Sequence, residues 1–139
     1  MIAAVLIRGI HDREYSVLDA LKSLRLQRKH VCVLLTDTPS NRGQLQKVKD
    51  FVTWGTITDE TRKLLVSKRG KPAQGPLTDS RKKIHARVLK MDGKTLLPYF
   101  NLQPPRGGFG RKGIKVGFSA GGALGDRKEA MNKLITRMI

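Results

Sequence analysis

The fold is decided by the stretch VCVLLTDTPSNRGQLQKVKDFVTWGTI, residues 31–57. Residues 31–35 form an unbroken apolar run, and residues 51–57 are rich in β-branched and aromatic side chains. Both patterns favour strands. Between them, Thr38 is a good N-cap, and Pro39 suits the first position of a helix because the N–H that proline lacks has no partner there. The stretch therefore predicts a strand, a helix and a second strand.

The residues before this stretch predict one more strand and one more helix. Residues 2–8 are apolar and read as a buried strand, and Ser16, with Asp19 three positions later, resembles a capping box at the start of a helix. The apolar stripe of that helix comprises Val17, Leu18, Leu21, Leu24 and Leu26. In the helix after Pro39, the expected apolar face comprises Leu45, Val48 and Val52. The order β-α-β-α-β predicts two helices packed on one face of a small sheet.

The amino-acid composition changes after residue 57. This change divides the chain into a core, residues 1–57, and a basic extension, residues 58–139. Thr58 is expected to cap a helix that ends near Gly70, and a further helix is expected to start near Asp79. From Arg62 to Lys90 there are ten basic residues and one acidic residue, a bias that exceeds what a solvated helix face requires.

The last third of the chain is dominated by glycine. Residues 98–102 predict a short strand, and residues 107–125 contain eight of the chain's 14 glycines. With so few apolar side chains, this loop is expected not to pack as a core and to need an external surface to order it. Asp126 is expected to cap a closing helix, whose apolar stripe comprises Met131, Leu134, Ile135 and Met138.

Charge indicates the class of partner. The 139 residues include 28 Lys and Arg against 11 Asp and Glu, a net charge of +17. Such an excess repels itself in the compact state and attracts polyanions, so nucleic acid is favoured over a merely solubilising surface, which mixes both signs. A single cysteine, Cys32, excludes an internal disulfide, and the three histidines have no zinc-ligand spacing. With no signal peptide and no apolar stretch of bilayer length, we expect a cytoplasmic protein that does not bind membranes.

Two segments carry candidate nucleic-acid contacts. The N–H groups at the start of the Pro39 helix, together with Arg42, predict a phosphate-sized socket. In the glycine-rich loop, Arg106, Arg111, Lys112 and Lys115 supply cations, and the glycine backbone is able to approach phosphates closely. For Phe109 and Phe118, two aromatic residues of this loop, the sequence favours two roles equally. Each residue either stacks on an unpaired base or anchors the loop to the domain.

No constellation of catalytic residues is recognisable. The letters G-x-G-x-x-G occur at residues 108–113, but no strand precedes them and no helix pattern follows, so we interpret the match as accidental. We therefore expect no enzyme activity, no cofactor, no metal and no small-molecule substrate. An RNA-modifying enzyme and a free-standing nucleic-acid chaperone or chromatin protein are the alternatives to a binding protein that is a fixed part of a larger RNA assembly.

Several of these segments together resemble one known family. They are LRLQR at 24–28, CVL at 32–34, the run from 37 to 57, PRGGF at 105–109 and GGALGDR at 121–127. They are similar to large-subunit ribosomal protein thirty, in its long archaeal and eukaryotic form with a C-terminal extension. At residues 71–97, where archaeal relatives usually carry a longer and more acidic helical insertion, this chain has a shorter basic one.

The resemblance implies an α+β fold with a small three-stranded antiparallel sheet, similar to the ferredoxin-like arrangement. It implies a place in the large ribosomal subunit, on the large-subunit RNA near the 5S RNA and beside other ribosomal proteins. The RNA contacts that it implies lie at the start of the second helix, in the turn before the second strand and in the glycine-rich loop. The full predicted RNA-binding set is Arg8, Arg25, Arg28, Thr38, Arg42, Gly43, Lys47, Arg106, Gly107, Gly108, Arg111, Lys112, Lys115 and Arg127.

Overall fold

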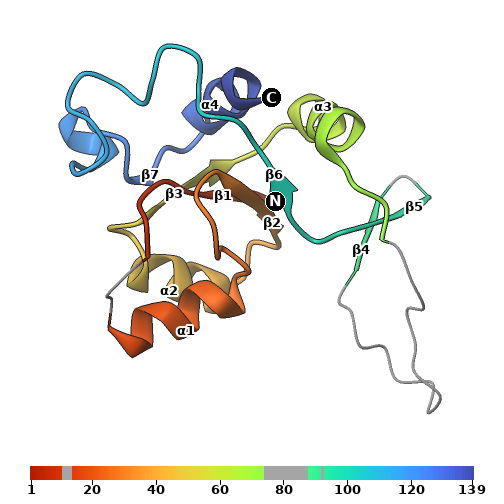
Figure 1. The fold of residues 1–139 in the computed structure, drawn as a ribbon, viewed down its shortest axis with the longest axis horizontal. Coiled ribbons are helices and arrows are strands. Elements are labelled where there is room, and N and C mark those ends of the chain that lie inside the picture. The colour runs from red at the N-terminus through yellow and green to blue at the C-terminus, as the bar shows by residue number, and fades with distance from the viewer. Residues whose placement is uncertain (11–13, 74–87, 92) are drawn as a thin grey trace.

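The fold is an α+β arrangement with helices on both sides of one sheet (Figure 1). The computed structural model describes residues 1–10, 14–73, 88–91 and 93–139. The helix expected to start near Asp79 falls outside them. The elements, in chain order, are β1 (Ile2–Leu6), α1 (Tyr15–Ser23), β2 (Val31–Leu35), α2 (Pro39–Lys47), β3 (Val52–Thr56), α3 (Asp59–Arg69), β4 (Leu89–Met91), β5 (Lys94–Leu96), β6 (Phe100–Asn101), the 3₁₀ turn η1 (Phe118–Ala120), β7 (Gly125–Asp126) and α4 (Ala130–Met138).

The main sheet has five strands in the order β6-β2-β1-β3-β7. Its centre is antiparallel, with β1 between β2 and β3, whereas β7 pairs with β3 in parallel. The sheet is thus mixed and larger than the three antiparallel strands expected. The extra strands come from the extension, where two short segments pair with backbone that would otherwise be open on the outer strands. The ferredoxin-like likeness stays a prediction.

The helices α1 and α2 lie together on one face of the sheet (Figure 1). Alternate residues of β1 point to opposite faces, so Ile2, Ala4 and Leu6 pack against these two helices. The buried residues Leu45, Val48 and Val52 meet in the same cluster. Val52, however, belongs to β3, because α2 ends at Lys47 and the chain turns before residue 52.

The helices α3 and α4 cover the other face of the sheet, so the extension completes the core (Figure 1). Here Ala3 and Val5 of β1 pack with the four predicted apolar residues of α4, which are at most 2% exposed. Because β1 is buried on both faces, its sequence is a continuous apolar run rather than an alternating one. Cys32, which was predicted to be a buried strand residue, packs in the same cluster. Burial raises the pKa of its thiol to about 12.

Two of the four predicted helix caps are confirmed. The Thr58 hydroxyl accepts a hydrogen bond from the Thr61 N–H at 3.4 Å, and α3 ends at Arg69, next to Gly70, as expected. The Thr38 cap is described below. The predicted Ser16 cap is wrong, because Ser16 lies inside α1, which follows Glu14. The predicted Asp126 cap is also wrong: Asp126 lies in β7 and accepts from the Lys128 N–H at 2.9 Å, before α4 begins.

Gly55 sets the distance between β3 and α4. A methyl group at this position would overlap the carbonyl oxygen of Lys128 and lie 2.8 Å from Cβ of Met131. We expect Gly55→Ala to lower the free energy of unfolding by about 1–3 kcal/mol, because the helix has to move away from the sheet. The matched control is Gly43→Ala in α2, where nothing lies within 4 Å, and which we expect to raise stability by up to about 1 kcal/mol. Urea unfolding measures both, and equal midpoints for the two variants would contradict this reading.

Candidate nucleic-acid interface

The start of α2 is built as its sequence predicts. The Thr38 hydroxyl accepts a hydrogen bond from the Asn41 N–H at 3.3 Å, and Pro39 is the first helical residue. The Arg42 N–H bonds to the Thr38 carbonyl at 3.0 Å, as in a regular first turn. Proline has no N–H, and the Asn41 and Arg42 N–H groups both bond to Thr38. The predicted phosphate socket therefore has few free backbone donors, and it stays a prediction.

The Arg42 side chain has a partner within the protein. Its Nε and Nη2 donate to the two carboxylate oxygens of Asp37, at 2.5 and 2.6 Å. This hydrogen bond lowers the pKa of the Asp37 carboxyl and raises that of Arg42. Both side chains are exposed, Arg42 by 66% and Asp37 by 40%, and exposed pairs of this kind contribute little to stability. A phosphate is therefore able to exchange with the carboxylate at small cost.

Arg8 lies close to the end of α2 in space. Its Nη1 donates to the Asp50 carbonyl at 3.1 Å, and its guanidinium lies 5.4 Å from the centre of the Phe51 ring. Arg25, half-buried, has a positive φ of 62° in the turn that follows α1, a conformation costly for most residues. Arg28, in the same turn, is exposed.

The entry of the glycine-rich loop is held by α4. Nε of Arg137 donates to the Arg106 carbonyl at 2.8 Å, and its Nη2 donates to the Gly108 carbonyl. In return, the Arg106 N–H donates to the Arg137 carbonyl at 3.1 Å. Phe109 stacks on the His30 ring, with centroids 6.0 Å apart and planes 9° apart. For Phe109 the structure thus favours the anchoring role over the base-stacking role. Burial, and then Lys29, lower the pKa of His30.

The exit of the loop is held by Arg127, which is only 8% exposed. Its Nε donates to Thr53 Oγ1 at 2.9 Å and its Nη2 to the Ala123 carbonyl at 3.0 Å, while its guanidinium lies 4.7 Å from the centre of the Phe118 ring. Burial lowers the pKa of Arg127. Because the protein surrounds its guanidinium, the structure gives Arg127 an anchoring role, and its expected contact with RNA stays a prediction.

The expectation that the glycine-rich loop does not pack as a core is wrong. Ala123 and Leu124 are buried with Ile7, and Phe109 and Ile114 cover this small cluster. No helix opens after residues 108–113, where the backbone turns and Gly113 N–H bonds to the Gly110 carbonyl at 3.3 Å. The match to G-x-G-x-x-G therefore lacks the helix that a dinucleotide-binding loop needs.

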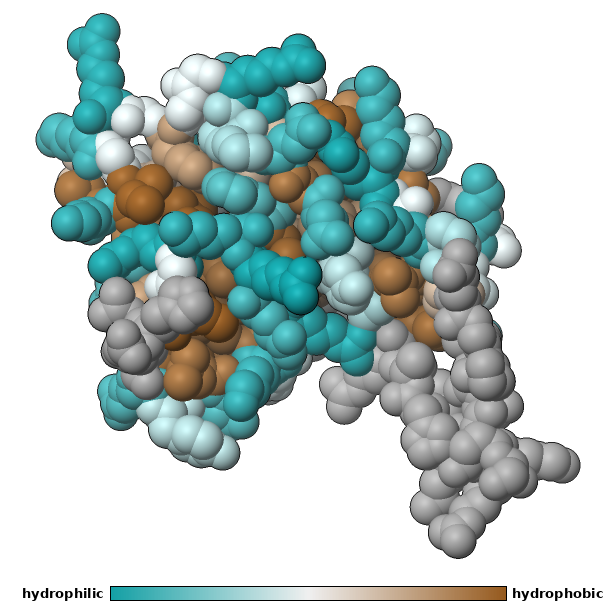
Figure 2. All heavy atoms as spheres, in the orientation of Figure 1, coloured by the Kyte–Doolittle hydropathy of each residue, from teal (hydrophilic) through white to brown (hydrophobic). Residues whose placement is uncertain are grey.

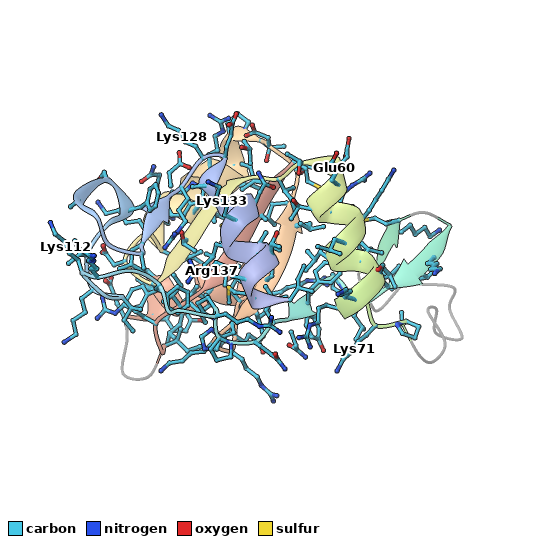
Figure 3. All side chains as sticks on the ribbon, turned by 90° about the horizontal axis from the view of Figure 1, so that it is seen from above. Glu60, Lys71, Lys112, Lys128, Lys133 and Arg137 are labelled. Carbon is cyan, nitrogen blue, oxygen red and sulfur yellow. The ribbon has the colours of Figure 1, made fainter. Side chains whose placement is uncertain are left out.

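Between its two held ends, the loop presents exposed cations. Arg111, Lys112 and Lys115 are all exposed, and Figure 3 shows Lys112 at the edge of the molecule opposite Lys71. Hydrophilic side chains cover most of the face seen in Figure 2. Of the predicted set, Arg8 and Arg25 are half-buried, Arg127 is buried, and the exposed members are Arg28, Thr38, Arg42, Gly43, Lys47, Arg106, Gly107, Gly108, Arg111, Lys112 and Lys115.

The fold brings α2 and the glycine-rich loop to one groove. A hollow of about 180 Å³ is lined by Arg42 and Gln46 of α2, Trp54 of β3, and Asp126 and Lys128. A second hollow of about 410 Å³ shares Gln46, Trp54 and Asp126 with the first, and adds Lys49, Lys115, Phe118 and Ser119. We call these two adjoining hollows the Trp54 groove. Arg42 and Lys115, predicted from separate motifs, line the same groove.

Sequence reasoning missed several of these positions. Lys49, Trp54 and Lys128 line the groove, and Arg137 holds the loop, yet none was in the predicted set. For Lys49 a signal was available, because it follows Arg42 and Gln46 at the spacing of one helix face. The other three depend on contacts between distant segments.

Two features are not found within the described ranges of the chain. No group of three His, Cys, Asp or Glu side chains in that part of the chain is placed to hold a metal ion. No helix there has the length and apolar character needed to cross a bilayer.

Comparisons with known proteins give one consistent result. The family model of ribosomal protein L30p/L7e matches residues 2–52. Across 96% of this chain and 100% of the relative, the sequence is 41% identical to large ribosomal subunit protein uL30 of Methanopyrus kandleri. It is 37% identical to the protein of the same name from Nanoarchaeum equitans, over 96% of this chain and 95% of that one. For Methanococcus maripaludis the identity is 36%, over 99% and 98%.

Proposed function

This chain belongs to the L30p/L7e family of ribosomal proteins, and on that premise we propose that it is a structural constituent of the large ribosomal subunit. In this role it binds folded large-subunit RNA near the 5S RNA, beside other ribosomal proteins, in the cytoplasm, and it catalyses no reaction. The observation that carries the proposal is the match over nearly the whole chain to several archaeal proteins named for that subunit.

We propose that binding is achieved mainly by phosphate contacts and by recognition of RNA shape. The net charge of +17 supports this mode, as does the exposure of Arg42, Arg111, Lys112 and Lys115. In this arrangement residues 1–57 are the RNA-binding core, and residues 58–139 are a basic extension that adds the glycine-rich loop. Arg127 is left out of the proposed RNA contacts, because it is buried.

Sedimentation tests the proposal directly. On a sucrose gradient of cell extract, the protein is expected to travel quantitatively with the large subunit, and to leave it only when the RNA is degraded or the salt is raised. A protein that stays at the top of the gradient rejects the proposal, and one that spreads over all RNA rejects it in favour of a nucleic-acid chaperone.

Arg42 gives a sharper test of the α2 contact. We expect Arg42→Ala to weaken binding to large-subunit RNA roughly five- to tenfold at 0.1 M salt, since one phosphate contact is lost. The unfolding midpoint is expected to stay unchanged, because the Asp37 carboxylate with which Arg42 pairs is exposed. The matched variant Asp37→Asn removes the competing carboxylate and is expected to strengthen binding. If Asp37→Asn weakens binding as much as Arg42→Ala does, the ion pair itself is the recognised feature.

A further inference from the structure

We infer that the Trp54 groove binds a short stretch of unpaired RNA, with phosphates on its lysines and a base against its aromatic residues. The inference rests on the proposed function and extends it, because it assigns one part of the surface to single-stranded RNA. The groove is lined by residues of β3, of α2 and the turn after it, and of the segment that leads into β7. Figure 1 shows β7 beside β3, and α2 on one face of the sheet.

Cations from both sides of the groove supply the phosphate contacts. Arg42 and Lys49 come from α2 and the turn after it, while Lys115 and Lys128 come from the extension. Lys49, Lys115 and Lys128 are exposed, and the exposed Arg42 pairs with the exposed carboxylate of Asp37. A strand lying between the two sides has cations within reach along its whole path, which is how grooves for single strands follow the backbone.

Aromatic side chains lie between these cations. Trp54 lines both hollows with the small part of its side chain that is exposed, 8%, and Phe118 lines the larger one. Base–aromatic contacts of this kind stabilise single strands regardless of sequence, because every base presents a flat apolar face. For Phe118, whose role the sequence left open, this assigns a base contact in addition to its contact with Arg127.

The acidic residues of the groove favour a single strand over a duplex. Asp50 and Asp126 line the larger hollow, and Asp37 lines the smaller one. A duplex backbone would set phosphates against these carboxylates. An unpaired base instead presents amino and imino N–H groups along its pairing edge, and carboxylates and the Gln46 amide accept hydrogen bonds from such donors.

The groove is built before any ligand arrives. Behind Phe118, the Arg127 guanidinium is fixed by Thr53 of β3 and by the Ala123 carbonyl. The Thr53 hydroxyl also lies 3.1 Å from the Gly125 carbonyl, to which it donates. A wall held in this way does not have to be ordered on binding, so less affinity is lost to conformational entropy.

The single tryptophan makes the groove observable in the intact protein. Tryptophan fluorescence is recorded while the full chain is titrated with a single-stranded RNA hexamer, and separately with a blunt-ended RNA duplex long enough to stay fully paired. We expect a saturable change with the hexamer and a much weaker one with the duplex. An equal change with both overturns the preference for unpaired RNA.

Two lysines provide the matched variants. The double variant Lys49→Ala/Lys115→Ala is expected to weaken hexamer binding about twenty-fold at 0.1 M salt, as the loss of two phosphate contacts to a single strand implies. The control is Lys133→Ala on α4, which is exposed and lines neither hollow, and which is expected to bind like the native protein. Equal urea midpoints for all three proteins show that the fold is intact. Equal losses for both variants would overturn the assignment to this groove.

Sedimentation with the large subunit distinguishes a failure of the groove assignment from a failure of the proposed function. If the native protein sediments with the subunit but the hexamer leaves the fluorescence unchanged, the inference fails and the proposed function stands; the groove then faces duplex RNA or a protein segment. If the protein does not sediment with the subunit, the proposed function fails first.

Discussion

Arg127→Ala is expected to lower the free energy of unfolding by roughly 2–4 kcal/mol, since hydrogen bonds to a charged group are among the stronger ones and their loss leaves a cavity. In the native protein the guanidinium joins Thr53 of β3 to the Ala123 carbonyl and covers the Phe118 ring. Its removal takes away the guanidinium donors of the Ala123 carbonyl and of the Thr53 hydroxyl. Urea unfolding measures the loss, and amide hydrogen exchange over residues 118–125 is expected to accelerate.

Two further variants serve as controls for this result. Arg111→Ala removes an equal charge from the exposed part of the same loop and is expected to change stability by less than about 0.5 kcal/mol. Arg127→Lys keeps the charge but loses the planar fork that serves two acceptors at once, so an intermediate loss is expected. If Arg127→Ala proves as stable as Arg111→Ala, then Arg127 does not fix the loop. The residue would then have to be returned to the set of RNA contacts.

The second large effect concerns the salt dependence of RNA binding. If about eight phosphates are neutralised, the logarithm of affinity for a large-subunit RNA fragment is expected to fall with the logarithm of salt at a slope of about −6 to −7. The triple variant Arg111→Ala/Lys112→Ala/Lys115→Ala is expected to reduce that slope by about 2–3, and to weaken binding on the order of a hundredfold at 0.1 M salt. Filter binding over a range of salt concentrations measures both quantities.

A charge-matched control distinguishes a site from a general attraction. Lys63→Ala/Lys68→Ala/Lys133→Ala removes the same charge from exposed positions on α3 and α4, outside the predicted contact set. This control is expected to change the slope much less than the loop variant does. Equal changes of the slope in the two triple variants would mean that RNA binding depends only on the net charge of the protein. A native protein with almost no salt dependence would reject phosphate contacts altogether.

Local signals predicted much of the fold. Thr38 and Thr58 cap α2 and α3 as expected, because a hydroxyl followed by a free N–H three residues later is a contact that the chain makes with itself. The stripe from Met131 to Met138 is buried as predicted, because an apolar face of that period has to meet a core. Ser16 and Asp126 show the limit of such signals: the residue type suits a cap, but the helices begin elsewhere.

The candidate interface was predicted less completely, because it joins segments that are distant in the chain. Arg42 and Lys115 were expected as separate contacts, and the fold places both on one groove with Trp54 between them. The ion pair of Arg42 with Asp37 was not anticipated, although the two residues are five apart. A carboxylate beside a predicted anion socket reads in sequence as a turn residue.

The two strands and the helix of residues 31–57, the apolar stripe of α4 and the excess of positive charge follow from the amino-acid sequence, because each depends on neighbouring residues or on composition. The exposure of individual arginines depends instead on contacts between distant segments. Arg111 and Arg127 lie in the same basic, glycine-rich segment, yet the first is exposed and the second is buried against β3. Burial of a charge requires acceptors, and one of them, the Thr53 hydroxyl, is distant in the chain and is brought to Arg127 by the pairing of β7 with β3.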